Sequence, residues 1–217
     1  MLKPMAMAEL SPGPGLDMAG FALAVLLIEL TPGPNMAWLA GLAATEGRRT
    51  GMSAVAGVAI GLLASGTLAA LGLAAVLAAA PALWKILRFA GAAMMGWLAI
   101  EAWRGAGEAA PGAPTGDGTR RAFFTGALIN LLNPKAYMFF VVVAPQFLNG
   151  DVLSLGNALL LSVVSAVIAT AIHCGIVLAG SKAQAWLTDS ARTQWVRRAF
   201  AVVMFGVAVS FLLIDIG

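Results

Sequence analysis

Long apolar stretches recur along the whole chain and are separated by short segments that are polar or rich in Gly and Pro. A helix needs about 20 mostly apolar residues to span a bilayer, and these stretches reach that length. The pattern therefore predicts an all-α, polytopic membrane helix bundle with six spans. We expect the spans at residues 18–44, 51–80, 84–104, 122–148, 152–180 and 195–215.

Composition strengthens this prediction and argues against a nucleic-acid partner. Hydrophobic residues make up 60% of the 217 positions and charged residues only 11%, with a mean hydropathy of +0.90. Soluble domains carry about 25% charged residues, so this chain lacks the polar surface of one. The formal net charge of +3 is too small to indicate nucleic-acid binding. The expected surroundings are therefore a lipid bilayer.

Residues 1–17 do not have the pattern of a secretory signal, because charges and prolines interrupt any apolar core. We expect this segment to be a disordered N-terminal lead before a single membrane domain at 18–217. A second segment rich in Gly, Pro and Ala, at 105–121, predicts a flexible loop at the midpoint of that domain. It separates residues 18–104 from residues 122–217, with three predicted spans on each side.

Lys and Arg are distributed unequally among the predicted loops. Nine of them lie near the loops after the first, third and fifth spans, whereas Lys3, Lys85 and Arg88 lie near the other span ends. The positive-inside rule then places those three loops in the cytoplasm and both termini outside.

The two halves also show signs of an internal duplication. With three spans in each half, the second half enters the membrane in the opposite direction. Aligning residue n with residue n+102 sets Pro32 against Pro134, each inside the first span of its half. Inverted repeats of this kind build many secondary transporters. We therefore expect two inverted three-helix repeats, at 18–104 and 122–217.

The first span contains a Pro-Gly-Pro sequence that is incompatible with a continuous helix. Pro32 has no N–H, so the carbonyl of Ile28 loses its helical partner, and Gly33 tolerates unusual dihedrals. A new half-helix is expected to start near Pro34, because proline suits the first helical position. The N–H groups expected to be unpaired are those of Asn35, Met36 and Ala37. Such a terminus favours an anion such as a carboxylate.

The fourth span contains a second break with amide side chains around it. Pro134 frees the carbonyl of Asn130, and Asn130 shares one helical face with Asn133. Lys135 adds a cation. Irregular backbone in hydrocarbon persists only where protein buries it or where it lines a wet cavity. The two breaks therefore predict a polar cavity, although kinks that serve only packing are the alternative.

Three ionisable residues lie away from the span ends: Glu29, Lys135 and His173. A charge at the bilayer centre costs about 2.5–3.5 kcal/mol on insertion scales, so each should face a partner or water. We expect Glu29 to bind an amino group or a proton and Lys135 to attract a carboxylate. The alternative for this pair is a permanent ion pair that only sets helix register. His173 is a second candidate proton carrier, or a hydrogen-bonded core histidine.

These motifs resemble those of the LysE/RhtB translocator family, over residues 18–215. The motifs that carry the resemblance are Thr31-Pro32-Gly33-Pro34-Asn35, Gly47-Arg48-Arg49-x-Gly51 and Asn133-Pro134-Lys135-Ala136. The resemblance implies a secondary-active exporter in the cytoplasmic membrane, which carries amino acids or close derivatives and is driven by the proton-motive force. The Pro-Gly-Pro-Asn form is similar to the threonine/homoserine branch, which implies a neutral substrate. Family positions carry over to Pro32, Gly33, Pro34, Asn35, Asn133, Pro134 and Lys135, whereas the role of Glu29 depends on the membrane argument alone.

The predicted substrate site can now be stated in full. It consists of Glu29, Thr31, Pro32, Gly33, Pro34, Asn35, Asn130, Asn133, Pro134 and Lys135. Glu29 and His173 are the candidates for proton coupling. The expected partners are an amino acid, protons and lipid, and the sequence allows a homo-oligomer without predicting one.

Other classes of function fit the sequence less well. No HExxH, GxSxG or CxxC motif is present, so we expect neither an enzyme nor a catalytic residue, a cofactor or a metal. An inorganic-ion or metal exporter of related fold needs clustered ligands, whereas the single intramembrane Glu, His and Cys are scattered along the sequence. A non-transporting membrane subunit remains an alternative, but it would not need a polar break in each half.

Overall fold

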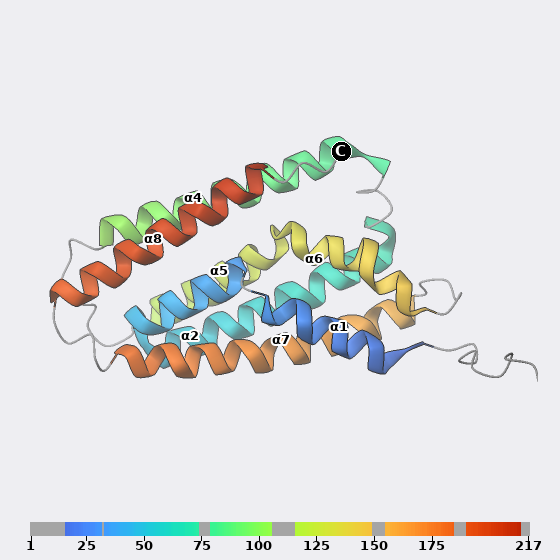
Figure 1. Cartoon of the computed structure of the whole chain (residues 1–217), viewed down its shortest axis with the longest axis horizontal. Helices are drawn as coiled ribbons and strands as arrows, with labels where there is room; N and C mark the ends of the chain where they lie inside the picture. The colour runs from blue at the N-terminus through green and yellow to red at the C-terminus, as the bar shows by residue number, and fades with distance from the viewer. Residues whose placement is uncertain are drawn as a thin grey trace, which may run out of the picture.

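The computed structural model describes residues 16–31, 33–73, 79–105, 116–148, 155–184 and 190–213. Within these residues all secondary structure is helical, which confirms the all-α prediction. The longer helices are α1 (Met18–Leu30), α2 (Pro34–Leu68), α4 (Pro81–Gly105), α5 (Gly116–Leu131), α7 (Leu155–Gln184) and α8 (Ser190–Leu213) (Figure 1). The shorter pieces are η1 (Ala69–Leu73), α6 (Pro134–Met138), η2 (Phe139–Val143) and η3 (Ala144–Phe147). Most of the predicted lead, most of the predicted flexible loop, and Pro32 lie outside the described residues.

Four of the described helices are long and apolar enough to cross a membrane. These segments are Pro34–Leu68, Ala82–Arg104, Gly156–Lys182 and Ala191–Leu213. The predicted spans 84–104, 152–180 and 195–215 fall largely within α4, α7 and α8. The predicted first and fourth spans are instead divided among shorter helices, because each contains a proline break. The chain therefore has several membrane-capable helices, as expected of a multi-pass membrane protein, and two of the predicted spans are interrupted.

The predicted link between the first two spans, at 45–50, is replaced by a reversal at one residue. Gly47 has φ 86° and ψ 176°, a conformation essentially restricted to glycine. A Cβ placed on Gly51 would lie only 3.3 Å from the Cβ of Ala43, eight residues earlier. Eight residues of straight helix would separate them by about 12 Å. Thus α2 is a helical hairpin with a first arm at 34–46 and a second arm at 48–68 (Figure 1).

The helices pack in two groups. Figure 1 shows α4 and α8 side by side, and they share a core that includes Met95, Met204 and Phe211. The other group is formed by α1, α2, α5 and α7. Here the second arm of α2 approaches α5 so closely that a Cβ at Gly61 would lie 2.7 Å from the carbonyl oxygen of Ala127. Small residues are the usual means by which membrane helices come this close.

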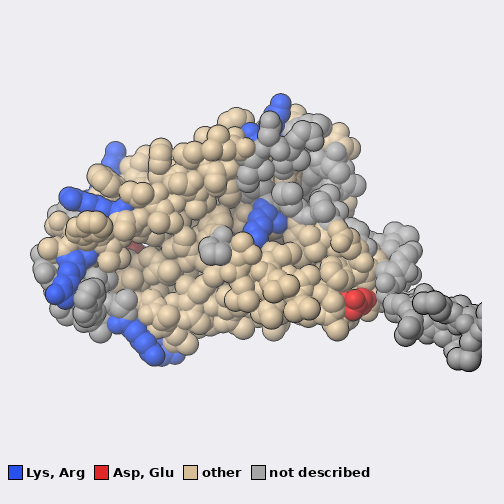
Figure 2. Space-filling view, viewed as in Figure 1, with Lys and Arg blue, Asp and Glu red and all other residues tan. Residues whose placement is uncertain are grey.

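Most of the described Lys and Arg side chains gather at one end of the long axis, which we call the basic end (the left end in Figures 1 and 2). The Gly47 turn, the end of α4, the start of α5, the end of α7 and the start of α8 meet there. The Lys and Arg residues of these segments are Arg48, Arg49, Arg104, Arg120, Arg121, Lys182, Arg192, Arg197 and Arg198. The structure thus brings together the Gly47 turn and the described helix ends that flank the other two loops, which charge counting assigns to the same side of the membrane.

Replacing the turn residue should destabilise the protein. Gly47→Ala forces a Cβ into a backbone conformation that costs about 1–3 kcal/mol for other residues. We expect a lower thermal unfolding midpoint in detergent and a smaller folded yield. Gly206→Ala is the matched control, because Gly206 is exposed on α8 and a Cβ there meets no atom within 4 Å. Equal stability of the two variants would contradict the strained turn.

Candidate functional site

Both predicted helix breaks are present in the structure. In the first, α1 ends at Leu30 and a new helix begins at Pro34, with Gly33 in extended conformation before it. In the second, α5 ends at Leu131 and α6 begins at Pro134. The predicted restart of the helix near Pro34 is confirmed.

The two breaks also have matching hydrogen bonds. The N–H of Thr31 donates to the carbonyl of Ile28 at 3.1 Å, and the N–H of Asn133 donates to the carbonyl of Asn130 at 3.1 Å. Both positions in the second bond are 102 residues after those in the first. Proline has no N–H, so in each break one carbonyl is left without its helical donor. The N–H of the residue just before the proline donates to that carbonyl instead.

The two restarting helices differ in how their first amides are satisfied. The Asn133 side chain accepts a hydrogen bond from the N–H of Lys135 at 3.0 Å, whereas no side chain caps the start of α2 at Gly33. The prediction that the Ala37 amide is unpaired was wrong, because this N–H donates to the Gly33 carbonyl at 3.1 Å. Gly33 is the N-cap residue, and its carbonyl accepts the first hydrogen bond of α2.

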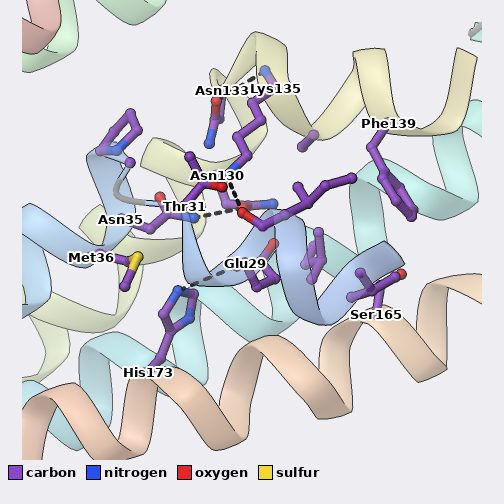
Figure 3. A pocket seen from close by; sticks show the side chains of 16 residues that line it. Glu29, Thr31, Asn35, Met36, Asn130, Asn133, Lys135, Phe139, Ser165 and His173 are labelled. Atoms are coloured by element: carbon purple, nitrogen blue, oxygen red, sulfur yellow. Dashed lines mark hydrogen bonds and ion pairs between the residues drawn. The ribbon is translucent and has the colours of Figure 1, made fainter. Parts of the chain in front are cut away.

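The two breaks face one small cavity midway along the molecule (Figure 3). Its volume is about 40 Å³, which is room for roughly three water molecules. The predicted site residues that line it are Glu29, Thr31, Gly33, Pro34, Asn35, Asn130, Asn133 and Lys135. Pro134 itself forms the first turn of α6.

Two hydrogen bonds connect one break directly to the other (Figure 3). The Lys135 ammonium donates to the carbonyl of Ile28 at 2.9 Å. The Asn35 amide nitrogen donates to the side-chain oxygen of Asn130 at 3.0 Å. The carbonyl that loses its helical partner in the first break is therefore bound by a cation from the second break.

Several buried polar atoms around the cavity have no hydrogen-bond partner among the described residues. They are Asn35 Oδ1, Asn130 Nδ2, Ser165 Oγ and His173 Nε2. A buried donor or acceptor that is left unsatisfied costs about 1–3 kcal/mol. Such groups are usually met by water or by a ligand. The cavity therefore offers both donors and acceptors to a small polar molecule.

The acidic residue of the site is closer to histidine than to lysine. Glu29 Oε2 lies 3.8 Å from His173 Nε2, an ion-pair distance that is too long for a hydrogen bond. Glu29 and Lys135 line the same cavity, as predicted, but these two described residues form no ion pair with each other. The Lys135 ammonium binds the Ile28 carbonyl instead. The rotation of α7 relative to α1 determines which side chain lies near Glu29. The spacing of residues within one span does not reveal that rotation.

Some cavity residues are absent from the predicted site. Ser165 comes from α7 and lies two helical turns before His173, a spacing that already placed the two on one face. Leu62 and Phe139 add an apolar wall from the second arm of α2 and from η2. No local sequence signal distinguishes these two residues from the other apolar residues of their helices.

Taken together, these features define a multi-pass membrane protein with a polar site between two broken helices. The chain matches the LysE type translocator family over residues 26–214, and it belongs to this family. Family membership confirms the resemblance seen in the motifs, and it indicates a transport protein of the cytoplasmic membrane rather than an enzyme.

The chain is also similar to several bacterial membrane proteins, two of which are named as efflux proteins. The homoserine/homoserine lactone efflux protein of Salmonella typhimurium is 27% identical over 181 residues, which cover 83% of this chain and 88% of that protein. The leucine efflux protein of Enterobacter sp. is 27% identical, covering 67% of this chain and 70% of that protein. An uncharacterized membrane protein of Pseudomonas aeruginosa is 30% identical, covering 78% and 82% respectively. No solved structure matches the chain.

A chemical cross-link can test whether the two breaks meet. In a Cys174→Ala background, Asn35→Cys combined with Asn130→Cys should react with dibromobimane, which fluoresces only when it bridges two neighbouring thiols. We expect strong fluorescence for this pair, because the two native side chains are hydrogen-bonded. Asn35→Cys combined with Ser210→Cys, a position exposed on α8, is the control. Equal signals from both pairs would disprove the arrangement.

Proposed function

We propose that the protein is a secondary-active exporter of neutral amino acids and that the substrate binds between the two helix breaks. The observation that carries this proposal is the single cavity on which both breaks converge, with unpaired buried donors and acceptors facing it. The names of the relatives agree with it, since they describe efflux of homoserine, threonine and leucine. Threonine or homoserine is the preferred substrate class, because the cavity wall contains polar groups beyond those needed for a backbone zwitterion.

The charged groups of the cavity suit the two ends of an amino acid. The carboxylate is proposed to bind near Lys135 and the uncapped start of α2, where the helix dipole also favours an anion. The amino group is proposed to bind Glu29 and the unpaired oxygen of Asn35. Asn130 Nδ2 and Ser165 Oγ then remain for a side-chain hydroxyl.

We further propose that the chain forms six spans as two inverted three-helix repeats, at 18–104 and 122–217. In this scheme α1 and the first arm of α2 form one discontinuous span, and α5, α6, η2 and η3 form its counterpart. The matching hydrogen bonds 102 residues apart support this scheme. The gathering of Lys and Arg at the basic end supports a cytoplasmic location for that end.

The cavity is too small for an amino acid in this conformation, so transport requires the breaks to move apart. The Lys135 bond to Ile28 and the Asn35 bond to Asn130 hold them together. A substrate carboxylate that binds the Lys135 ammonium competes with the Ile28 carbonyl for it. Substrate binding therefore loosens one of these two hydrogen bonds between the breaks, which is a differential interaction of the kind that shifts a conformational equilibrium.

Coupling to the proton-motive force is proposed to involve Glu29 and His173. Both line the cavity, and their facing atoms lie 3.8 Å apart, so protonation of either group changes its interaction with the other. A proton bound at Glu29 also removes the negative charge that attracts the substrate amino group. Binding of a proton and of the substrate are then mutually exclusive, as antiport requires.

No observation favours the metal-exporter alternative. In the parts of the chain that the structure describes, His, Cys, Asp and Glu form no cluster of three or more that would suit a metal ion. The cavity combines amides, two hydroxyls and a lysine with a single carboxylate and a single imidazole, a set that suits an organic zwitterion better than a divalent cation.

Removing the Asn130 amide should impair transport without unfolding the protein. We expect Asn130→Ala to lower the initial rate of L-threonine or L-homoserine efflux about fivefold, because a hydrogen bond to a neutral hydroxyl contributes about 0.5–1.5 kcal/mol. The measurement is efflux of radiolabelled amino acid from loaded cells, normalised to membrane abundance. Asn157→Ala, on α7 outside the cavity, serves as the control. Wild-type efflux by the Asn130 variant would contradict the substrate site.

Neutralising the intramembrane carboxylate should uncouple transport from protons. In proteoliposomes with an imposed pH gradient, Glu29→Gln should abolish proton-driven accumulation while retaining exchange of labelled for unlabelled substrate. Asp117→Asn, in the exposed first turn of α5, is the matched control. Full, pH-responsive transport by the Glu29 variant would refute the coupling role.

A further inference from the structure

A second and larger cavity opens at the basic end. Its volume is about 510 Å³, compared with 40 Å³ for the cavity at the breaks. Ligand sites for small molecules usually occupy about 300–1,000 Å³, so this cavity is large enough for an amino acid as it stands. We call it the basic-end vestibule. Its lining comes from the first arm of α2, α4, α5 and α8, and includes Trp38, Glu46, Trp97, Glu101, Arg121 and Arg197.

The vestibule contains charges of both signs. Arg121 on α5 forms an ion pair and hydrogen bond with Glu101 on α4. The Arg121 guanidinium also lies over the ring of Trp97, 5.6 Å from its centroid. Glu46, at the end of the first arm of α2, interacts electrostatically with Arg197 and Arg121 and is repelled by Glu101. A carboxylate and a guanidinium are thus held on different helices around one open space.

The Glu101–Arg121 pair is accessible to a ligand. Their side chains are 41% and 59% exposed. Ion pairs of this exposure contribute about 0–1 kcal/mol, because water screens them and holding two long side chains costs entropy. A zwitterion that enters between the two residues replaces one charge contact with two. The pair therefore costs little to open for a molecule that has both an ammonium and a carboxylate group.

The vestibule also lies on the route to the cavity at the breaks. Buried Trp38 lines the vestibule, and Asn35 of the central cavity precedes it by three residues on the same arm of α2. Residues three apart are neighbours on a helix surface. Trp38 thus marks the boundary between the two spaces, and aromatic and apolar groups at Trp38, Trp97 and Phe200 form the walls that an aliphatic side chain would contact.

We propose that the basic-end vestibule is a separate loading site for zwitterionic amino acids, in which Arg121 binds the carboxylate and Glu46 and Glu101 bind the amino group. The site receives the substrate from the side of the basic end, before the breaks open. This inference rests on the proposed export function, and it adds a second binding position with its own residues.

Transport into inverted membrane vesicles tests the proposal, because the cytoplasmic face is then exposed to the added substrate. We expect Arg121→Gln to raise the KM for radiolabelled L-leucine and L-homoserine about tenfold while the maximal rate stays within about twofold. Arg120→Gln is the matched control, since Arg120 is exposed on α5, stacks over Phe124 and does not line the vestibule. Inhibition by L-leucinamide, which lacks the carboxylate, should be equal in wild type and Arg121→Gln.

A charge exchange separates substrate binding from simple stabilisation. The double variant Glu101→Arg, Arg121→Glu restores the ion pair, so its thermal stability should return to that of the wild type while its KM stays high. A KM that returns with the stability would overturn the loading site, as would an unchanged KM in Arg121→Gln. Absence of transport in the wild-type vesicles would instead refute the proposed export function, which the Arg121 variants alone do not test.

Discussion

A carbonyl oxygen that lacks a donor is costly inside hydrocarbon, and the central site depends on how this chain meets that constraint. Each proline break removes a helical N–H from a carbonyl four residues earlier. The backbone responds in the same way at both positions, by turning an amide back to Ile28 or Asn130. At the first break the lysine of the second break adds its ammonium to the same carbonyl. The lysine that helps to satisfy the freed carbonyl of the first break therefore also joins the two breaks.

The hydrogen bonds between the two breaks also explain why the cavity is polar. The Asn35–Asn130 hydrogen bond uses one donor from the first amide and one acceptor from the second, which leaves an oxygen on one and an N–H group on the other. A ligand that satisfies both must itself have an acceptor and a donor close together. Sites of this kind reject analogues that lack one of the two groups, because the unmatched protein atom then stays buried without a partner.

Much of this arrangement could be predicted from the sequence. Proline chemistry alone located both breaks and the start of α2 at Pro34, because a missing N–H is a local property of the residue. The cost of charge in hydrocarbon also identified Glu29, Lys135 and His173, and all three line the cavity.

Interactions between helices were less accessible to sequence reasoning. Glu29 lies within 4 Å of His173 because of how α1 and α7 are rotated, and the spacing of residues within each helix does not encode that rotation. The sequence did not predict the basic-end vestibule, for a different reason. Arg121 and Arg197 were already accounted for by the charge asymmetry of membrane proteins, so nothing marked them as ligands.

The single-residue reversal at Gly47 has a mechanical consequence. Because no flexible loop separates the two arms of α2, a displacement of the first arm passes directly into the second. The first arm of α2 begins at the first break. The second arm packs tightly on α5, and the second break lies at the end of α5. A movement of the backbone at one break is therefore transmitted to the other break through the two arms of α2, which rotate about Gly47.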